Sequence, residues 1–136
     1  MTDNRRKILL MDDEKSILDI YQRTFTLLGY DVHLACNGSE AIKLFKELSK
    51  LGYHFNIVVL DLNIAQGMGA IETIKALKKI DTKIKSIVVS GYSDDPVLLK
   101  YKKYGFDAVV IKPFKVNELN KIIKQLLSEE RNNRSH

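Results

Sequence analysis

The sequence has few of the features that mark membrane-bound or secreted proteins. Its apolar runs are only a few residues long, too short for a membrane-spanning helix. The basic N-terminus is followed by a brief apolar stretch and then by acidic residues, a pattern unlike a secretion signal. The single cysteine, Cys36, cannot form an intramolecular disulfide. We therefore expect a cytoplasmic protein with no membrane partner.

Internal repeats and low-complexity linkers are also missing, and 136 residues are a usual length for one domain. A hydrophobic content of 45% with 29% charged residues is typical of a globular rather than a disordered chain. The net charge of +5 raises nucleic acid as a partner. However, the lysines are spread over several predicted helices without a DNA-reading motif. We interpret them as solvated helix faces and expect no direct nucleic-acid binding.

Short apolar segments alternate with amphipathic ones along the whole chain. Strands are predicted at residues 7–11, 31–35, 55–60, 84–89 and 108–111. The segments after them have apolar residues at helical spacing, and the last such helix is predicted to end near Leu127. Helix starts are indicated at Asn37 and Asp95, and Gly105 indicates a stop. This alternation predicts an α/β fold with a parallel sheet and helices on both faces.

Chemically reactive side chains stand at the ends of these strands. Asp12 and Asp13 follow the first strand, Asp61 the third, Ser90 the fourth and Lys112 the fifth. In a parallel sheet these ends share one edge, where α/β proteins bind ligands. Carboxylates about 5 Å apart repel by roughly 3 kcal/mol per pair at a dielectric of about 20, so a cation is needed among them. All-oxygen ligation suits Mg²⁺, and these groups together are those that phosphoryl transfer requires.

This set of residues resembles the receiver domain of two-component response regulators. The amino-acid sequences at residues 67–69, 90–93 and 104–106 are similar to those of receivers of hybrid sensor histidine kinases. The resemblance implies a flavodoxin-like (βα)5 fold with strand order 2-1-3-4-5 over residues 7–127. Residues 1–6 are then a polar N-terminal extension and residues 128–136 a polar C-terminal tail, expected to fray. The motif residues that carry the resemblance are Asp12, Asp13, Asp61, Ser90, Lys112, Pro113 and Phe114.

The resemblance also implies a role for each acidic residue. Asp61 is expected to accept a phosphoryl group from a histidine kinase or a histidine phosphotransfer protein. Asp13 and Asp61 are expected to bind Mg²⁺ directly, together with the backbone carbonyl of Asn63. Asp12 is expected to contribute mainly through bound water. Phosphorylation is then expected to shift a conformational equilibrium that a downstream protein reads, without turnover of an external substrate.

Two further expectations concern the fourth and fifth strand ends. Ser90 is expected to donate its hydroxyl to one phosphoryl oxygen, and Lys112 to pair with another. The peptide bond between Lys112 and Pro113 is expected to be cis.

The sequence departs from the family pattern at two positions. The loop after Asp61 has Ile64 and Ala65 where receivers usually have Met-Pro or a similar pair. Val109, three residues before Lys112, replaces the aromatic residue that usually swings inward on phosphorylation. The aromatic part of the switch is therefore missing or has moved, with Tyr92, Tyr101 and Tyr104 as candidates.

Purely structural roles for these residues, and other protein classes, remain open as interpretations. Taken singly, Asp12 and Asp13 could complement a helix dipole, Ser90 and Asn63 could be turn residues, and Lys112 could be a solvated strand end. A haloacid-dehalogenase-type phosphatase needs an acid where this chain has Asn63. A flavodoxin-like FMN carrier needs a hydroxyl- and glycine-rich first loop, which is acidic here. A docking-only pseudo-receiver is expected to lack one of the active groups, and none is missing.

Overall fold

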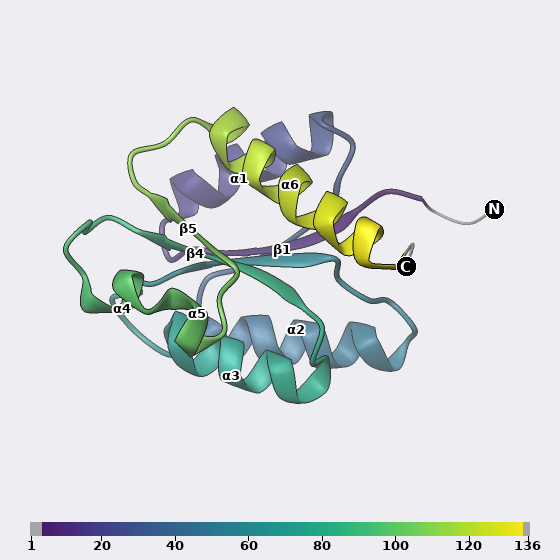
Figure 1. The fold of residues 1–136 in the computed structure, drawn as a ribbon, viewed down its shortest axis with the longest axis horizontal. Coiled ribbons are helices and arrows are strands. Elements are labelled where there is room, and N and C mark those ends of the chain that lie inside the picture. Colours follow the sequence, from purple (N-terminus) through teal and green to yellow (C-terminus); the bar gives the residue numbers. More distant parts are fainter. Residues whose placement is uncertain (1–3, 135–136) are drawn as a thin grey trace.

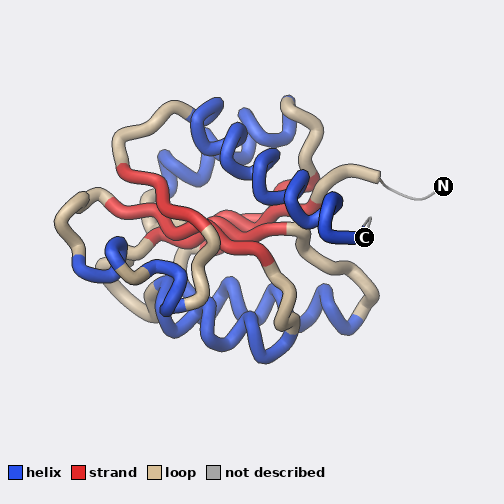
Figure 2. The backbone as a smooth tube through the Cα atoms, in the orientation of Figure 1, coloured by secondary structure: helices blue, strands red, loops and turns tan. Residues whose placement is uncertain are grey.

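A parallel five-stranded sheet lies between two layers of helices in the computed structural model, which describes residues 4–134 (Figure 1). The strand order is β2-β1-β3-β4-β5 with every pair parallel, which confirms the predicted flavodoxin-like α/β fold. Figure 2 shows the strands as one central layer. The strands are β1 (Lys7–Met11), β2 (Asp31–Ala35), β3 (Ile57–Asp61), β4 (Lys85–Ser90) and β5 (Ala108–Ile111).

Each face of the sheet is covered by its own set of helices. One face carries α1 and α6, and the other carries α2 and α3, with the short α4 and α5 beside α3 (Figure 1). The helices are α1 (Lys15–Leu27), α2 (Gly38–Lys50), α3 (Ala70–Ile80), α4 (Pro96–Leu99), α5 (Tyr101–Tyr104) and α6 (Val116–Arg134). None of the helices within residues 4–134 is both long and apolar enough to cross a bilayer.

The core is divided between the two faces by the alternation of the central strands. Leu10 and Val59 pack in the cluster beneath α1 and α6, whereas Leu9 and Val58 pack in the cluster beneath α2 and α3. All five residues of β3 are buried, as its continuous apolar run predicts. The edge strand β2 is largely half-buried, which agrees with its alternating pattern. The third strand end is therefore fixed by packing on both sides.

The fourth helix was predicted as one piece from Asp95 to Gly105, and this prediction is wrong. Its ends are as predicted, because the Asp95 side chain accepts from Val97 N at 3.0 Å and Gly105 takes a left-handed conformation with φ of 105°. The helix breaks at Lys100, however, where φ is −123° and ψ is 30°. The Lys100 amide donates to Val97 O, one residue short of the α-helical pattern, and this tightens and ends α4.

The last helix was predicted to end near Leu127, but it continues to Arg134. Residues 128–134 contain neither proline nor glycine, and polarity by itself does not end a helix. Residues 1–3 of the predicted N-terminal extension and residues 135–136 of the predicted tail lie outside the described residues. The domain bounds themselves remain a prediction.

Candidate functional site

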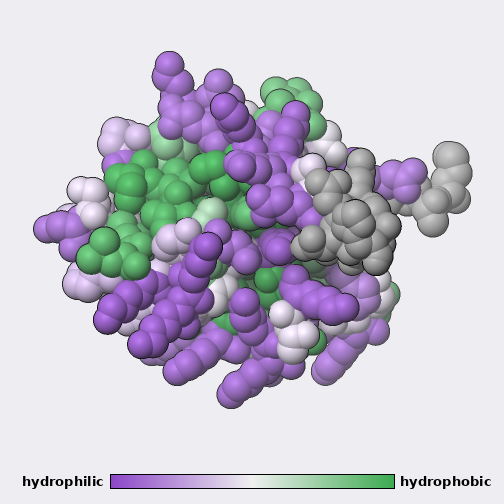
Figure 3. All heavy atoms as spheres, in the orientation of Figure 1, coloured by the Kyte–Doolittle hydropathy of each residue, from purple (hydrophilic) through white to green (hydrophobic). Residues whose placement is uncertain are grey.

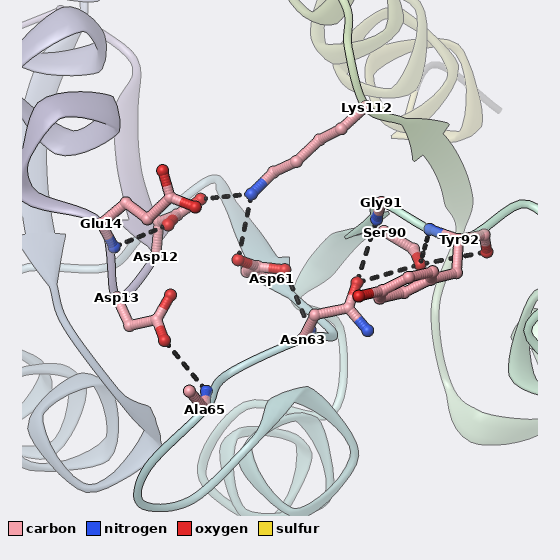
Figure 4. A network of polar contacts seen from close by, with 10 residues as sticks. All are labelled: Asp12, Asp13, Glu14, Asp61, Asn63, Ala65, Ser90, Gly91, Tyr92 and Lys112. Carbon is pink, nitrogen blue, oxygen red and sulfur yellow. Dashed lines mark hydrogen bonds and ion pairs between the residues drawn. The ribbon is translucent and has the colours of Figure 1, made fainter.

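The strand ends bring the predicted site residues to one edge of the sheet (Figure 4). Asp12 directly follows β1, Asp61 and Ser90 are the last residues of β3 and β4, and Lys112 directly follows β5. Asn63 lies in the loop after β3. These residues come from four strands but surround one pocket, because parallel strands all end on the same side.

Lys112 joins the two buried carboxylates of the pocket. Its Nζ lies 2.9 Å from Asp12 Oδ2 and 3.1 Å from Asp61 Oδ2. Asp12 is 1% and Asp61 3% exposed, so water screens the repulsion between their charges only weakly. A buried carboxylate is costly without a cationic partner, and Lys112 supplies that partner from the end of the edge strand β5.

The same surroundings shift the ionisation of the pair. Burial raises the pKa of Asp61 and the charge of Asp12 adds to this, while the Asn63 amide and Lys112 oppose it without cancelling it. Burial lowers the pKa of Lys112, but the hydrogen bond to Asp12 and the charge of Asp61 outweigh it, so the net direction is upward. Lys112 therefore stays protonated. Further positive charge near Asp61 would stabilise its ionised carboxylate.

Backbone amides hold all three carboxylates in place. Glu14 N donates to Asp12 Oδ1, and Asn63 N donates to Asp61 Oδ1, both at 2.9 Å. Asp13 is exposed, and its Oδ2 accepts from the amide of Ala65, also at 2.9 Å, across the pocket mouth. Each carboxylate is thus oriented by a donor that carries no net charge.

The donor set fits a small divalent cation. Asp12, Asp13 and Asp61 each offer a carboxylate oxygen, and these oxygens lie within 4.8 Å of one another. Three carboxylates against the single ammonium of Lys112 leave the cluster negative. Oxygen ligands with few protein carboxylates are what Mg²⁺ prefers, because it keeps several of its own waters.

Ser90 lies at the pocket but is turned toward Asn63. Its hydroxyl donates to Asn63 Oδ1 at 3.1 Å, with Tyr92 O as a second acceptor at 3.2 Å. The Gly91 amide donates to the same Asn63 oxygen at 2.9 Å. Within residues 4–134, no hydrogen bond joins Ser90 to Asp61. Sequence reasoning gave Asn63 only a backbone role and missed this side-chain contact, because an amide in a loop reads as a turn residue.

The two departures from the family pattern have different surroundings. Val109 is half-buried and packs against the cluster beneath α2 and α3, against which Leu98 and Tyr101 also pack. Tyr92 is 63% exposed, and its backbone amide donates to the Ser90 hydroxyl.

The Lys112–Pro113 bond is cis, as expected. The Ala65 amide is a donor that sequence reasoning did not include.

Comparison with known proteins agrees with this geometry. The family model described as "Response regulator receiver domain" matches residues 8–124. The chain is 30% identical to sporulation initiation phosphotransferase F of Bacillus subtilis, over 89% of this chain and 93% of that protein. It is 32% identical to chemotaxis protein CheY of Thermotoga maritima, over 88% and 98%.

Larger relatives and a solved structure show the same similarity. The chain is 29% identical to the regulatory protein AtoC of Escherichia coli, of which it spans 25%. It is 34% identical to the probable transcriptional regulator ycf27 of Porphyridium aerugineum, of which it spans 48%. It therefore spans a quarter to a half of the length of these relatives. A CheY-like receiver domain from Methanospirillum hungatei superposes with a TM-score of 0.84 at 25% identity, covering 96% of this chain and 99% of that one.

Proposed function

Because this chain belongs to the response regulator receiver family, whose members accept phosphoryl groups in two-component signalling, we propose that Asp61 is its phosphoacceptor. The proposal depends on one observation above all. Asp61 is a buried carboxylate at the end of the central strand, 3.1 Å from the Lys112 ammonium and grouped with Asp12 and Asp13. Family members interact with histidine kinases or phosphotransfer proteins, so a phosphohistidine of such a protein is the proposed donor.

The proposed transfer is a displacement at phosphorus. A carboxylate oxygen of Asp61 attacks, the new P–O bond forms, and the P–N bond of the phosphohistidine breaks. The leaving imidazole keeps the bonding electron pair and takes up a proton. Lys112 pairs with a phosphoryl oxygen, and Ser90 donates to another after its hydroxyl has left Asn63. These two groups stabilise the charge that the transition state spreads over the phosphoryl oxygens.

The acidic cluster is the proposed Mg²⁺ site. Asp13 and Asp61 would bind the ion directly with the backbone carbonyl of Asn63, and Asp12 mainly through water. When bound, Mg²⁺ supplies positive charge to the phosphoryl oxygens. Lys112 meanwhile bridges Asp12 and Asp61 and so holds the carboxylate of Asp61 in place.

The proposed phosphodonor is a protein that docks beside Lys112. A hollow of about 240 Å³ lies there, and its lining is mainly apolar. Ile20, on its rim, is 50% exposed. An apolar rim next to a charged pocket suits a helical surface that carries a phosphohistidine. The residues that line the hollow are Ile17, Ile20, Tyr21, Lys112, Pro113, Phe114 and Val116.

The proposed output surface runs from Asp95 to Lys115. Figure 3 shows apolar side chains gathered over β5 and the segment that follows it. Leu99 is 87% and Ile111 37% exposed. A downstream protein is the proposed reader of this surface. That this chain does not bind nucleic acid directly remains a prediction. A cytoplasmic location and the lack of turnover on an external substrate also remain predictions.

Labelling with a small phosphodonor tests the phosphoacceptor. Incubation with phosphoramidate and Mg²⁺ should add one phosphoryl group, read as intact mass, because phosphoramidate carries the same P–N bond as a phosphohistidine. Asp61→Asn should take up none, and removing Mg²⁺ with EDTA should abolish labelling. The matched control is Asp94→Asn, since Asp94 is exposed and outside the pocket. An unchanged adduct in Asp61→Asn would assign the acceptor to another residue.

A further inference from the structure

Asp13 differs from the other two carboxylates of the acidic cluster because packing does not hold it. Asp12 and Asp61 are almost fully buried, whereas Asp13 is exposed. An exposed carboxylate on a loop rotates freely unless a hydrogen bond fixes it. The contact that fixes this one is the Ala65 amide, 2.9 Å from Asp13 Oδ2. Figure 4 shows the other oxygen of Asp13 turned back toward the pocket.

The Ala65 amide is itself presented from a loop that is anchored on both sides. Before it, the Asn63 side chain is bonded to Gly91 N at 2.9 Å. After it, the Met68 carbonyl accepts from Gly38 N at 2.8 Å, at the start of α2. Neither anchor involves Asp13, so the loop has contacts of its own on both sides of Ala65.

This donor exists because residue 65 is not proline. Proline has no N–H and could not donate to Asp13. A chain with the more usual Met-Pro pair at residues 64 and 65 would lack this contact. The departure from the family pattern in this loop therefore has a chemical consequence at the proposed metal site.

We propose that the Ala65 amide is a positioning group for metal binding, which holds Asp13 with one oxygen facing the Mg²⁺ site. A carboxylate has about four lone-pair positions, so an oxygen occupied by an amide leaves the other free for the ion. Holding Asp13 in advance lowers the entropic cost of recruiting it when the ion binds. The inference rests on the proposed role of Asp13 as a Mg²⁺ ligand.

The test is the Mg²⁺ affinity of Ala65→Pro, measured by isothermal titration calorimetry on the full chain. Proline removes the N–H, and Ala65→Ser keeps it as the matched control. We expect Ala65→Pro to bind Mg²⁺ about fivefold more weakly, because the freed Asp13 side chain must then be immobilised when the ion binds. Ala65→Ser should bind as the unchanged chain does. In EDTA, the unfolding temperature of Ala65→Pro should fall by no more than the few degrees that one exposed hydrogen bond accounts for, and that of Ala65→Ser should be unchanged.

The outcomes separate this inference from the proposed function. If Ala65→Pro binds Mg²⁺ as tightly as the unchanged chain while Asp13→Ala loses binding, the positioning role is wrong and the metal site stands. If Ala65→Pro lowers the metal-free unfolding temperature by much more than one exposed hydrogen bond accounts for, the amide supports the loop and does not position Asp13. If the unchanged chain binds no Mg²⁺, or Asp13→Ala binds it equally well, the metal assignment and this inference both fall.

Discussion

Lys112 shows how a single side chain makes the pocket possible. Asp12 and Asp61 are buried side by side, and the ammonium lies within hydrogen-bonding distance of both. Without it, two carboxylates would face each other in a region of low dielectric, where their repulsion is several times stronger than in water. The stability of the metal-free protein should therefore depend on this lysine.

Replacing Lys112 with methionine should lower the free energy of unfolding by about 2 kcal/mol at neutral pH, since it leaves buried charges unpaired. The loss should shrink as the pH falls, because protonating Asp61, whose pKa is already raised, removes one of the repelling charges. Urea unfolding at several pH values measures both effects. Lys115→Met is the matched control, since Lys115 is exposed. Equal stability of the two variants would contradict this account of the pocket.

At the scale of elements, the start of α2 packs against the loop that carries Asn63 and Ala65. Gly38 begins this helix against the loop and α3, and a Cβ placed there would lie 2.1 Å from Thr73 Oγ1 and 2.7 Å from Met68 Cγ. Thr73 is fully buried, and its hydroxyl donates to Gly69 O. The close approach of the two helices therefore requires glycine at this position.

Gly38→Ala should cost about 2 kcal/mol of unfolding free energy, as overpacking at a buried contact usually does. The matched control is Gly91→Ala, because a Cβ built there has no heavy atom within 4 Å other than those of Gly91 and its two chain neighbours. Thermal or urea unfolding of the two variants makes the comparison. A Gly38→Ala variant as stable as Gly91→Ala would mean that Thr73 and Met68 move aside at little cost.

Element boundaries show what the sequence could and could not reveal. Asn37 caps α2 as predicted, accepting from Glu40 N, because capping depends on neighbouring residues. The break at Lys100 has no such local signal, and the extension of α6 past Leu127 was missed because polar residues were taken for a frayed end. Likewise, the Ala65 amide is a backbone group, and no side-chain pattern marks which amide will meet Asp13.

For the whole molecule, the alternation of strands and helices was enough to predict the sheet and the edge where Asp12, Asp61 and Lys112 meet. That follows because parallel strands must end on one side and buried strands have recognisable apolar runs. The direction of the Ser90 hydroxyl did not follow, since it depends on Asn63 from a different loop. Contacts between loops are set by the assembled fold and lie beyond local patterns.

The central claim is that this assembled pocket makes Asp61 the residue that becomes phosphorylated. The most direct measurement reduces the phosphorylated protein with borohydride, which converts an aspartyl phosphate to homoserine, and locates the homoserine by peptide mass spectrometry. The account predicts homoserine at position 61, and only when Mg²⁺ was present during phosphorylation. Homoserine at position 12 or 13 instead, or a phosphoryl group that survives reduction on Ser90, would contradict it.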